Sequence, residues 1–302
     1  MLKSIRLPAS IVFATVFGCL AASPARADDV AIFKKLMEQR GPSVVTLKFV
    51  LKIKGGGGEQ ESETEINGVM IDPKGLVICS GTQTGGFSES MRRRIGRGGD
   101  FSVTPTDMKV LIGDDSEGVE AKIVARDTDL DLAWVQITKP ADKPYDFVDL
   151  SKGPSAKPGE EAFVVRRMDK FFDRAEVISE GWIAGIVKKP RELYVPGGTI
   201  NNANGLAAFN ANGEPLGFLI MQMSDEDESR SSRGASGTFI LPNAEVIKAT
   251  QRARESAASG KSVDADAETD SDKKSDDKDA DSKDKKPKSG DAKSEDSKSN
   301  DD

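Results

Sequence analysis

The side chains available for chemistry are restricted in this chain of 302 residues, which contains no histidine and two cysteines, Cys19 and Cys79. Histidine is the side chain that most often moves protons near neutral pH, so imidazole-based catalysis is excluded. A zinc site needs several thiolate or imidazole ligands, and the scattered aspartates lack the pattern of a calcium-binding loop. We therefore expect no metal and no cofactor.

Two nucleophile candidates and one basic cluster remain. Cys79 lies in an apolar stretch, where a lone cysteine is usually a small buried hydrophobe, and as a nucleophile it would need a neighbouring Lys or Arg to lower its pKa. Ser236 precedes a glycine, as a reactive serine often does. Arg92-Arg93-Arg94 and Arg97 lie in a glycine-rich loop, which suits either an anionic partner or a solvated loop.

The first 27 residues have the pattern of a secretory signal. A positive start precedes an apolar run at 11–22 that is too short to span a bilayer. Ala25-Arg26-Ala27 then places small residues where signal peptidase needs them, which predicts cleavage before Asp28. Two other interpretations stay open: lipid attachment at Cys19 and an uncleaved anchor. We expect an exported protein, periplasmic or extracellular, with no transmembrane segment in the mature chain.

At the other end, the composition changes at about Ser256. Residues 256–302 are rich in Asp, Ser and Lys and contain no aromatic residue, leucine or isoleucine. Such a segment cannot bury enough apolar surface to offset its conformational entropy, so we expect a disordered acidic tail. It could bind cations, contact the envelope or only be solvated. With a net charge of −7, the chain shows no electrostatic signature of nucleic-acid binding.

Between these ends, alternating apolar and polar residues predict short strands separated by turns. The clearest strand is 45–53, and Asp72-Pro73-Lys74-Gly75 has the residues of a hairpin turn. The other predicted strands are 68–71, 76–78, 109–112, 119–124, 132–137, 162–165, 177–187, 192–195, 205–209, 215–221 and 237–241. A short helix around 33–40 ends at Gly41-Pro42, and a second helix covers about 243–257.

Three segments carry a recognisable pattern. They are Gly68 to Ile78, Ala121 to Ile137 with Asp129-Leu130-Asp131-Leu132-Ala133, and Asn202 to Leu219 with Asn210-Ala211-Asn212-Gly213. Their order and spacing resemble the trypsin-like serine peptidases, in particular the bacterial high-temperature-requirement (HtrA/Deg) branch, without a following PDZ module. The resemblance implies an all-β, trypsin-like double β-barrel over residues 28–255. A linker near 139–144 would separate a first barrel at about 41–140 from a second at about 144–242.

Aligning the three segments with the family also shows on which residues of this chain the family's catalytic positions would fall. Its histidine falls on Thr82, its aspartate on Asp131 and its serine on Asn204, while Asn202 and Leu206 replace glycines of the turn that forms the oxyanion hole. A serine nucleophile needs a base within hydrogen-bond reach, and neither a hydroxyl nor an amide takes up a proton near pH 7. The resemblance therefore implies a degenerate triad with no active catalytic residue.

Two of these residues allow different roles. Asp131 could cap a local turn, or it could hydrogen-bond Thr82 and hold the substrate cleft. Ser236 falls on the late strand that lines this cleft in the family, which favours a structural role over a reactive one.

Three functions follow as hypotheses. The leading one is a non-catalytic binding or scaffolding protein that holds a peptide or protein segment in the cleft between the barrels, by strand addition beside Gly181–Val187 or Ser236–Ile240. The second is a hydrolase with a rebuilt active site. The third is a structural envelope component that contacts its partners through the acidic tail.

Overall fold

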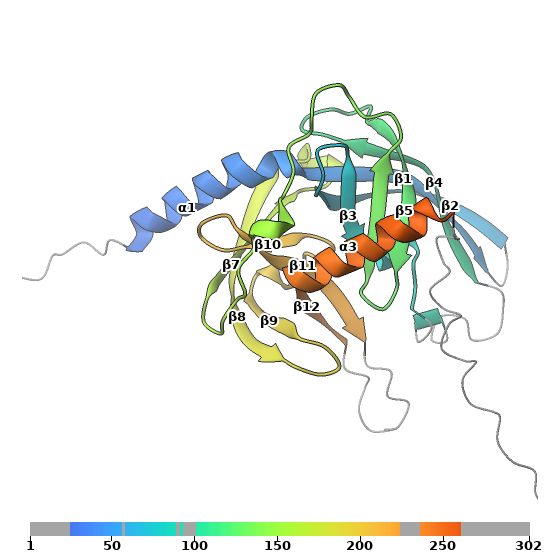
Figure 1. Ribbon diagram of the computed structural model, residues 1–302. Helices are drawn as coiled ribbons and strands as arrows, with labels where there is room; N and C mark the ends of the chain where they lie inside the picture. The colour runs from blue at the N-terminus through green and yellow to red at the C-terminus, as the bar shows by residue number, and fades with distance from the viewer. Residues whose placement is uncertain (1–24, 56–57, 89–90, 93–100, 224–235, 261–302) are drawn as a thin grey trace, which may run out of the picture. The chain divides into compact units, whose positions relative to one another are not determined.

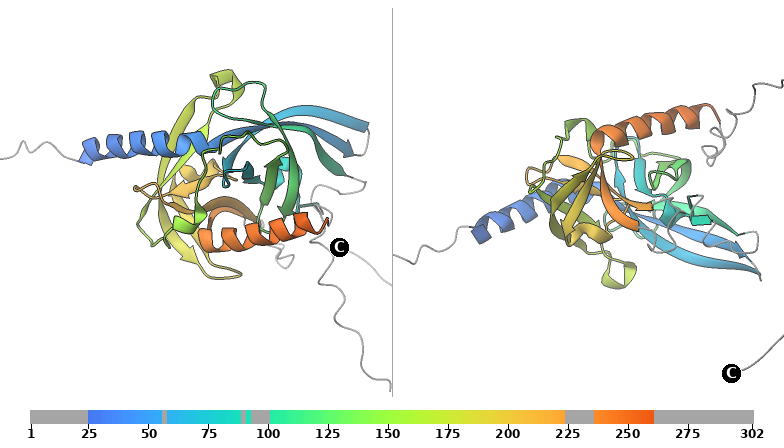
Figure 2. Two further views of the ribbon diagram at one scale, coloured as in Figure 1. Left: turned by 45° about the horizontal axis from the view of Figure 1, so that its top comes forward. Right: turned by 90° about the horizontal axis from the view of Figure 1, so that it is seen from below.

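The computed structural model describes residues 25–55, 58–88, 91–92, 101–223 and 236–260 of the chain. The body consists of two closed antiparallel barrels of six strands each, with a helix before them and another after them (Figure 1, Figure 2). The predicted all-β double barrel with two flanking helices is therefore confirmed.

The first barrel has the strand order β1-β2-β3-β6-β5-β4. Its strands are β1 (Val44–Gly55), β2 (Gly58–Met70), β3 (Leu76–Ser80), β4 (Ser102–Leu111), β5 (Val119–Asp127) and β6 (Leu132–Ile137). Alternate residues of β1 turn inward, so that Val45, Leu47 and Phe49 are buried with Val77 and Val135 in the barrel interior. The orientation alternates with the period of two that the sequence pattern predicts for a strand, but Val44 and Thr46 on the opposite face are buried as well.

The strands β1 and β2 form a hairpin longer than the sequence indicated. They pair from Val44↔Val69 to Gly55↔Gly58, and Figure 2 shows the pair projecting beyond the barrel. Residues 59–65 are all polar and give no apolar alternation, which is why no strand was expected there. Ion pairs with β1 line one face of the hairpin: Lys48–Glu63 at 3.1 Å, Lys52–Glu61 at 2.9 Å and Lys54–Glu59 at 3.4 Å.

The second barrel has the strand order β10-β11-β12-β9-β8-β7. Its strands are β7 (Glu161–Arg167), β8 (Glu176–Val187), β9 (Leu193–Gly198), β10 (Ala207–Phe209), β11 (Pro215–Met223) and β12 (Ser236–Pro242). Phe163, Phe209 and Phe218 are buried in its core. The same cluster continues onto the outer face of the first barrel through Ile78 and Trp134, so one apolar core joins the two barrels.

The two helices fasten opposite ends of the chain to this body. Helix α1 (Ala25–Arg40) is longer than expected and begins within the predicted signal segment. Its Phe33 packs edge-on against Phe163 of the second barrel, with ring centroids 5.8 Å apart. Helix α3 (Asn243–Ala258) lies across the first barrel, where Trp134 Nε1 donates to Thr250 Oγ1 at 3.0 Å. In the described part of the chain, no helix is both long enough and apolar enough to cross a membrane.

Polar contacts fix the position of one barrel against the other. Asn67 of β2 exchanges two hydrogen bonds with the backbone of Arg167 on β7, at 2.6 and 3.0 Å. The buried Arg167 guanidinium donates to the carbonyl of Val44 at 2.9 Å and pairs with Glu176. Each contact satisfies a polar group that the junction of the barrels removes from water.

Replacing Asn67 tests this coupling. Asn67→Ala leaves the N–H and C=O of Arg167 without their partner, and we expect a loss of about 2 kcal/mol in the free energy of unfolding. Urea denaturation measures it. Ser62→Ala, at an exposed position of the same strand, is the control and should change stability by less than about 0.5 kcal/mol. Equal effects of the two substitutions would contradict the inter-barrel role of Asn67.

Candidate functional site at the junction of the barrels

Asp131 lies at the tight turn before β6 and is only 2% exposed. Its Oδ1 accepts hydrogen bonds from Ser80 Oγ at 3.0 Å and from the backbone N–H of Thr82 at 2.7 Å. Its Oδ2 accepts from the backbone N–H of Met221 on β11, at 3.0 Å. One carboxylate therefore joins the first barrel to the second.

Thr82 begins a short 3₁₀ turn, η2 (Thr82–Thr84), directly after β3. The backbone N–H of Gly81 donates to the carbonyl of Asp131 at 2.9 Å, so main chain and side chain of Asp131 both hold this turn. Asp131 therefore caps a local turn and bonds to Thr82 within the first barrel, whereas its contact across the junction is with Met221.

Asn204 lies in the turn between η5 (Ile200–Asn202) and β10, and its Oδ1 accepts from Thr238 Oγ1 of β12 at 3.1 Å. The next residue, Gly205, has φ +82° and donates its N–H to the carbonyl of Leu219 at 2.7 Å. A Cβ at Gly205 would lie within 2.2 Å of the Ser80 nitrogen. The turn that carries Asn204 is thus pressed against β3 of the other barrel.

These contacts bring the three predicted positions to one junction. Asp131 contacts Thr82 directly and holds Met221, Met221 is the cross-strand partner of Thr238, and Thr238 bonds to Asn204. The chemical groups at this point are a carboxylate, three hydroxyls and an amide. The carboxylate accepts hydrogen bonds from Ser80, Thr82 and Met221, so the contacts that it makes lie within the junction.

Burial also controls the ionisation of this region. It raises the pKa of Asp131 above its ordinary value, and the donors from Thr82, Met221 and Ser80 offset the increase only in part. Burial likewise raises the pKa of the Cys79 thiol well above its usual range, with the charge of Asp131 adding to the effect. Cys79 is fully buried inside the first barrel, so the structure agrees with the packing role and not with a reactive thiolate.

The remaining sequence candidates do not join this site. Arg92 donates to the carbonyl of Phe87 at 3.2 Å, whereas Arg93, Arg94 and Arg97 lie outside the described residues. Ser236 begins β12 at the point where its backbone pairs with Met223. Within the described ranges, no cluster of three or more His, Cys, Asp or Glu residues could hold a metal ion.

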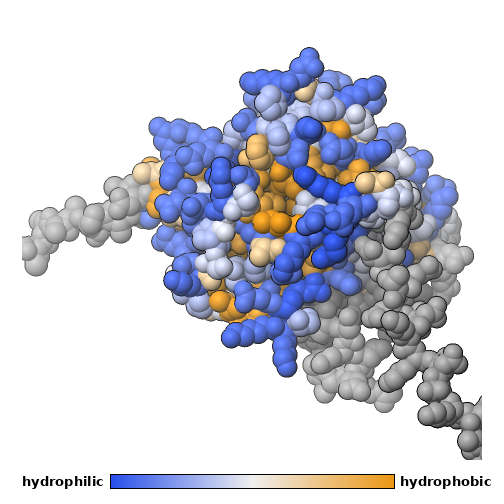
Figure 3. All heavy atoms as spheres, in the orientation of Figure 1, coloured by the Kyte–Doolittle hydropathy of each residue, from blue (hydrophilic) through white to orange (hydrophobic). Residues whose placement is uncertain are grey.

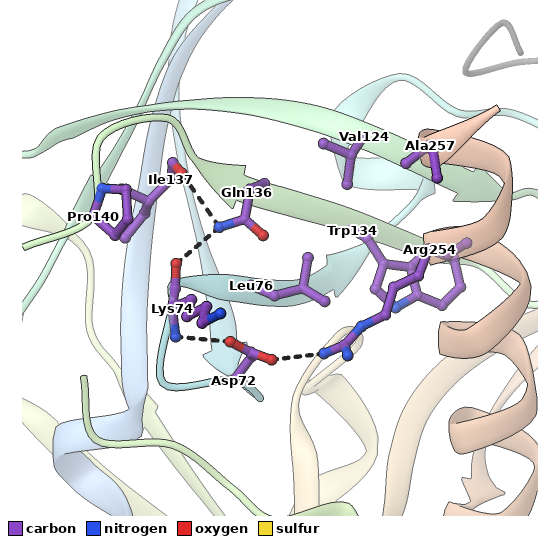
Figure 4. A pocket seen from close by; sticks show the side chains of 12 residues that line it. Asp72, Lys74, Leu76, Val124, Trp134, Gln136, Ile137, Pro140, Arg254 and Ala257 are labelled. Carbon is purple, nitrogen blue, oxygen red and sulfur yellow. Dashed lines mark hydrogen bonds and ion pairs between the residues drawn. The ribbon is translucent and has the colours of Figure 1, made fainter. Parts of the chain in front are cut away.

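A groove of about 520 Å³ lies elsewhere, between the last turns of α3 and the outer face of the first barrel (Figure 4). Arg254 reaches across it to Asp72, at 2.8 Å, and Gln136 donates to the carbonyl of Lys74 at 2.9 Å. The groove is therefore separate from the junction that holds Asp131 and Asn204.

Comparisons with known proteins concern the fold. No family model and no curated protein matches the chain. Among solved structures, an HtrA-type protease with a decapeptide is 16% identical (TM-score 0.49), and the match covers 74% of this chain and 66%, just under two thirds, of that one. The MamO protease domain from Magnetospirillum magneticum (apo form) is 15% identical (TM-score 0.43; 70% of this chain, 97% of that one), and Deg5 is 18% identical (TM-score 0.48; 75% and 93%).

This chain has the trypsin-like double-barrel fold. It consists of two closed antiparallel barrels, each of six strands.

Ser80, Met221 and Thr238 belong to the site although the sequence did not single them out. Met221 contributes only a backbone N–H, which every residue except proline has, so no sequence signal could have revealed it. Ser80 is two residues before Thr82 and could have been suspected as a partner for Asp131.

Gly205→Ala tests the close approach of the two barrels. The substitution adds left-handed backbone strain and a clash with Ser80, and we expect a loss of roughly 3 kcal/mol or more in unfolding free energy. Gly159→Ala is the matched control: its φ is also positive, at +90°, but no atom lies within 4 Å of its Cβ. The control should lose about 1 kcal/mol. If the two variants are equally stable, the turn is not tightly packed.

The raised pKa of Asp131 predicts a pH dependence with a definite sign. Between the ordinary Asp value of 3.8 and the higher folded value, the folded chain keeps a proton that the unfolded chain has lost. The stability contributed by Asp131 therefore falls as pH rises through this window and is constant above it. The difference in unfolding free energy between wild type and Asp131→Asn, measured from pH 3 to pH 8, isolates the effect. A difference that increases with pH would contradict it.

Proposed function

We propose that this protein is an exported, non-catalytic module that binds an extended peptide or protein segment along β12, beside Asn204. The proposal rests on one observation: over Gly237–Phe239, β12 pairs with β11 on one side and has no ladder partner among the described residues on the other, next to a site whose chemical groups hold the fold. The predicted signal at residues 1–27 supports the exported location.

The state of the catalytic positions argues against hydrolysis. Acyl transfer by a hydroxyl needs a base to remove its proton, and the chain has no histidine to supply one. Asp131 is occupied by Ser80, Thr82 and Met221, while the Asn204 amide accepts from Thr238. These bonds stabilise the junction, and none of them prepares a nucleophile.

The edge of β12 supports binding by strand addition. Along one side β12 pairs with β11 from Gly217↔Pro242 to Met223↔Ser236. On the other side its pairing with the described residues of β9 is limited to Ile240↔Tyr194. Gly237, Thr238 and Phe239 are half-buried, so part of this edge is accessible to an added strand.

The segment Gly181–Val187 of β8 offers a second edge of this kind. It pairs with β9 from Gly181↔Gly198 to Val187↔Leu193, and only its first two residues also pair with β7. We place the ligand at β12 because Thr238 of this strand bonds to Asn204.

Binding to a peptide array is the first test. We expect saturable binding of extended peptides, without cleavage, and at least about tenfold weaker binding for Asn204→Trp, because the added ring would cover the end of the β12 edge. Asn201→Trp, at an exposed position of the same turn region, is the control and should bind as wild type does.

Two outcomes would reject the proposal. One is the absence of binding both to the array and to extracts of the cell envelope. The other is turnover of casein that a single substitution in the site abolishes, which would favour the rebuilt hydrolase. Residues 261–302, on which the envelope-contact hypothesis depends, lie outside the described part of the chain; loss of binding on deleting 256–302 would favour that hypothesis.

A further inference from the structure

An exposed pair of aromatic rings forms the tip of the turn between β7 and β8. Phe171 is 89% and Phe172 is 52% exposed, and their rings meet edge-to-face with centroids 5.0 Å apart. We call these two side chains the aromatic tip. Exposed phenylalanines at such a turn contribute nothing to the core, and aromatic side chains are enriched at protein interfaces.

The turn that carries the aromatic tip is firmly held. Asp169 Oδ1 accepts from the N–H of Phe171 at 2.9 Å and caps the 3₁₀ turn η4 (Lys170–Phe172). Arg174 then forms a two-bond ion pair with Glu65 of β2, at 2.6 and 3.0 Å, and both side chains are largely buried. The rings are therefore presented on a rigid support, which reduces the entropy lost on binding.

The groove beside α3 is lined largely by apolar side chains and therefore complements the aromatic tip. Its floor consists of Leu76, Val124 and Trp134, and its α3 side consists of the small residues Ala253 and Ala257. Figure 3 shows apolar side chains gathered in a hollow on the face of the molecule that carries α3. Its volume of about 520 Å³ is within the range of about 300–1,000 Å³ in which proteins bind compact apolar groups.

The charges around the two features are also complementary. Exposed Asp169 and Asp173 flank the aromatic tip against one cation, Lys170, which gives the tip one net negative charge. At the groove, Lys74 and Arg254 outnumber Asp72 and leave one net positive charge. The Lys74 ammonium forms no ion pair within the described ranges, so it is available to a carboxylate. The attraction is small and should weaken with salt.

The relative positions of the aromatic tip and the groove decide whether they can meet within one molecule or only between two molecules. Figure 2 shows η4 and α3 on opposite sides of the body. The aromatic tip of a molecule cannot reach its own groove, but it can reach the groove of a second copy. Such a contact is head-to-tail, because the two surfaces that meet are different.

We propose that the aromatic tip of one molecule inserts into the α3 groove of a second copy. Two phenylalanine side chains bury roughly 150–250 Å² each, so the contact lies well below the roughly 1,200 Å² of a stable interface. The self-association is therefore weak and dependent on protein concentration, and each added copy leaves one tip and one groove free.

Sedimentation velocity of the chain from Asp28 onward, over a range of concentrations, tests the proposal. We expect the average mass to increase with concentration for wild type. Phe171→Ser with Phe172→Ser removes the tip, and Ala257→Trp fills the groove; each should weaken self-association by about tenfold or more. Ile247→Ala, a partly exposed apolar residue of α3 outside the groove lining, should behave as wild type. All changes are at exposed positions, and circular dichroism checks the fold of each variant.

Mixing the two defective variants gives the decisive result. The tip-deleted variant keeps a groove, and the groove-filled variant keeps a tip, so an equimolar mixture should form a one-to-one heterodimer and no larger species. Lys74→Glu in the tip-deleted partner should weaken this heterodimer. Wild type that stays monomeric at every concentration overturns the proposal. A mixture that stays monomeric while wild type associates, or single variants that associate as wild type does, also overturn it.

Discussion

The carboxylate of Asp131 is the group on which the junction of the two barrels depends. A carboxylate removed from water is unstable unless donors replace its hydration, and here Ser80 and Thr82 supply them from one barrel and Met221 from the other. The two barrels must therefore keep one relative position for the carboxylate to remain satisfied. Gly205 enforces the same position sterically, since its backbone lies directly against Ser80.

This arrangement gives Asp131 a structural role that requires no reaction. In a trypsin-like triad, the aspartate orients a histidine. The resemblance of the sequence places Thr82 at that histidine position, and in the structure the carboxylate accepts from the backbone of Thr82 and caps the turn after β3. Asp131 can therefore stabilise the junction without taking part in a reaction. Our proposed binding function uses this junction and the partly open edge of β12.

Both proposed interaction surfaces lie on rigid elements. The β12 edge belongs to a closed barrel, and the aromatic tip is held by Asp169 and by the ion pair between Arg174 and Glu65. The two proposals use different parts of the molecule: peptide binding requires the junction, whereas self-association requires η4 and the end of α3. A failure of either proposal leaves the other intact.

Residue types and spacing alone determined the main features of this protein. The absence of histidine excludes imidazole catalysis in any fold, and the alternation at Val45, Leu47 and Phe49 specifies a half-buried strand because β side chains have a period of two. The resemblance of three segments to the trypsin-like peptidases predicted the double barrel and selected Thr82, Asp131 and Asn204. The first half of β2 was missed because cross-strand ion pairs and not apolar alternation stabilise it.

The tertiary structure decided what those residues do. The N–H of Met221 carries no sequence signal, and its bond to Asp131 exists only because β11 passes the first barrel at that point. The exposure of Phe171 is equally invisible in the sequence, where two adjacent phenylalanines suggest a core. Burial and hydrogen-bond partners depend on contacts between residues far apart in the chain, and only the folded chain brings those residues together.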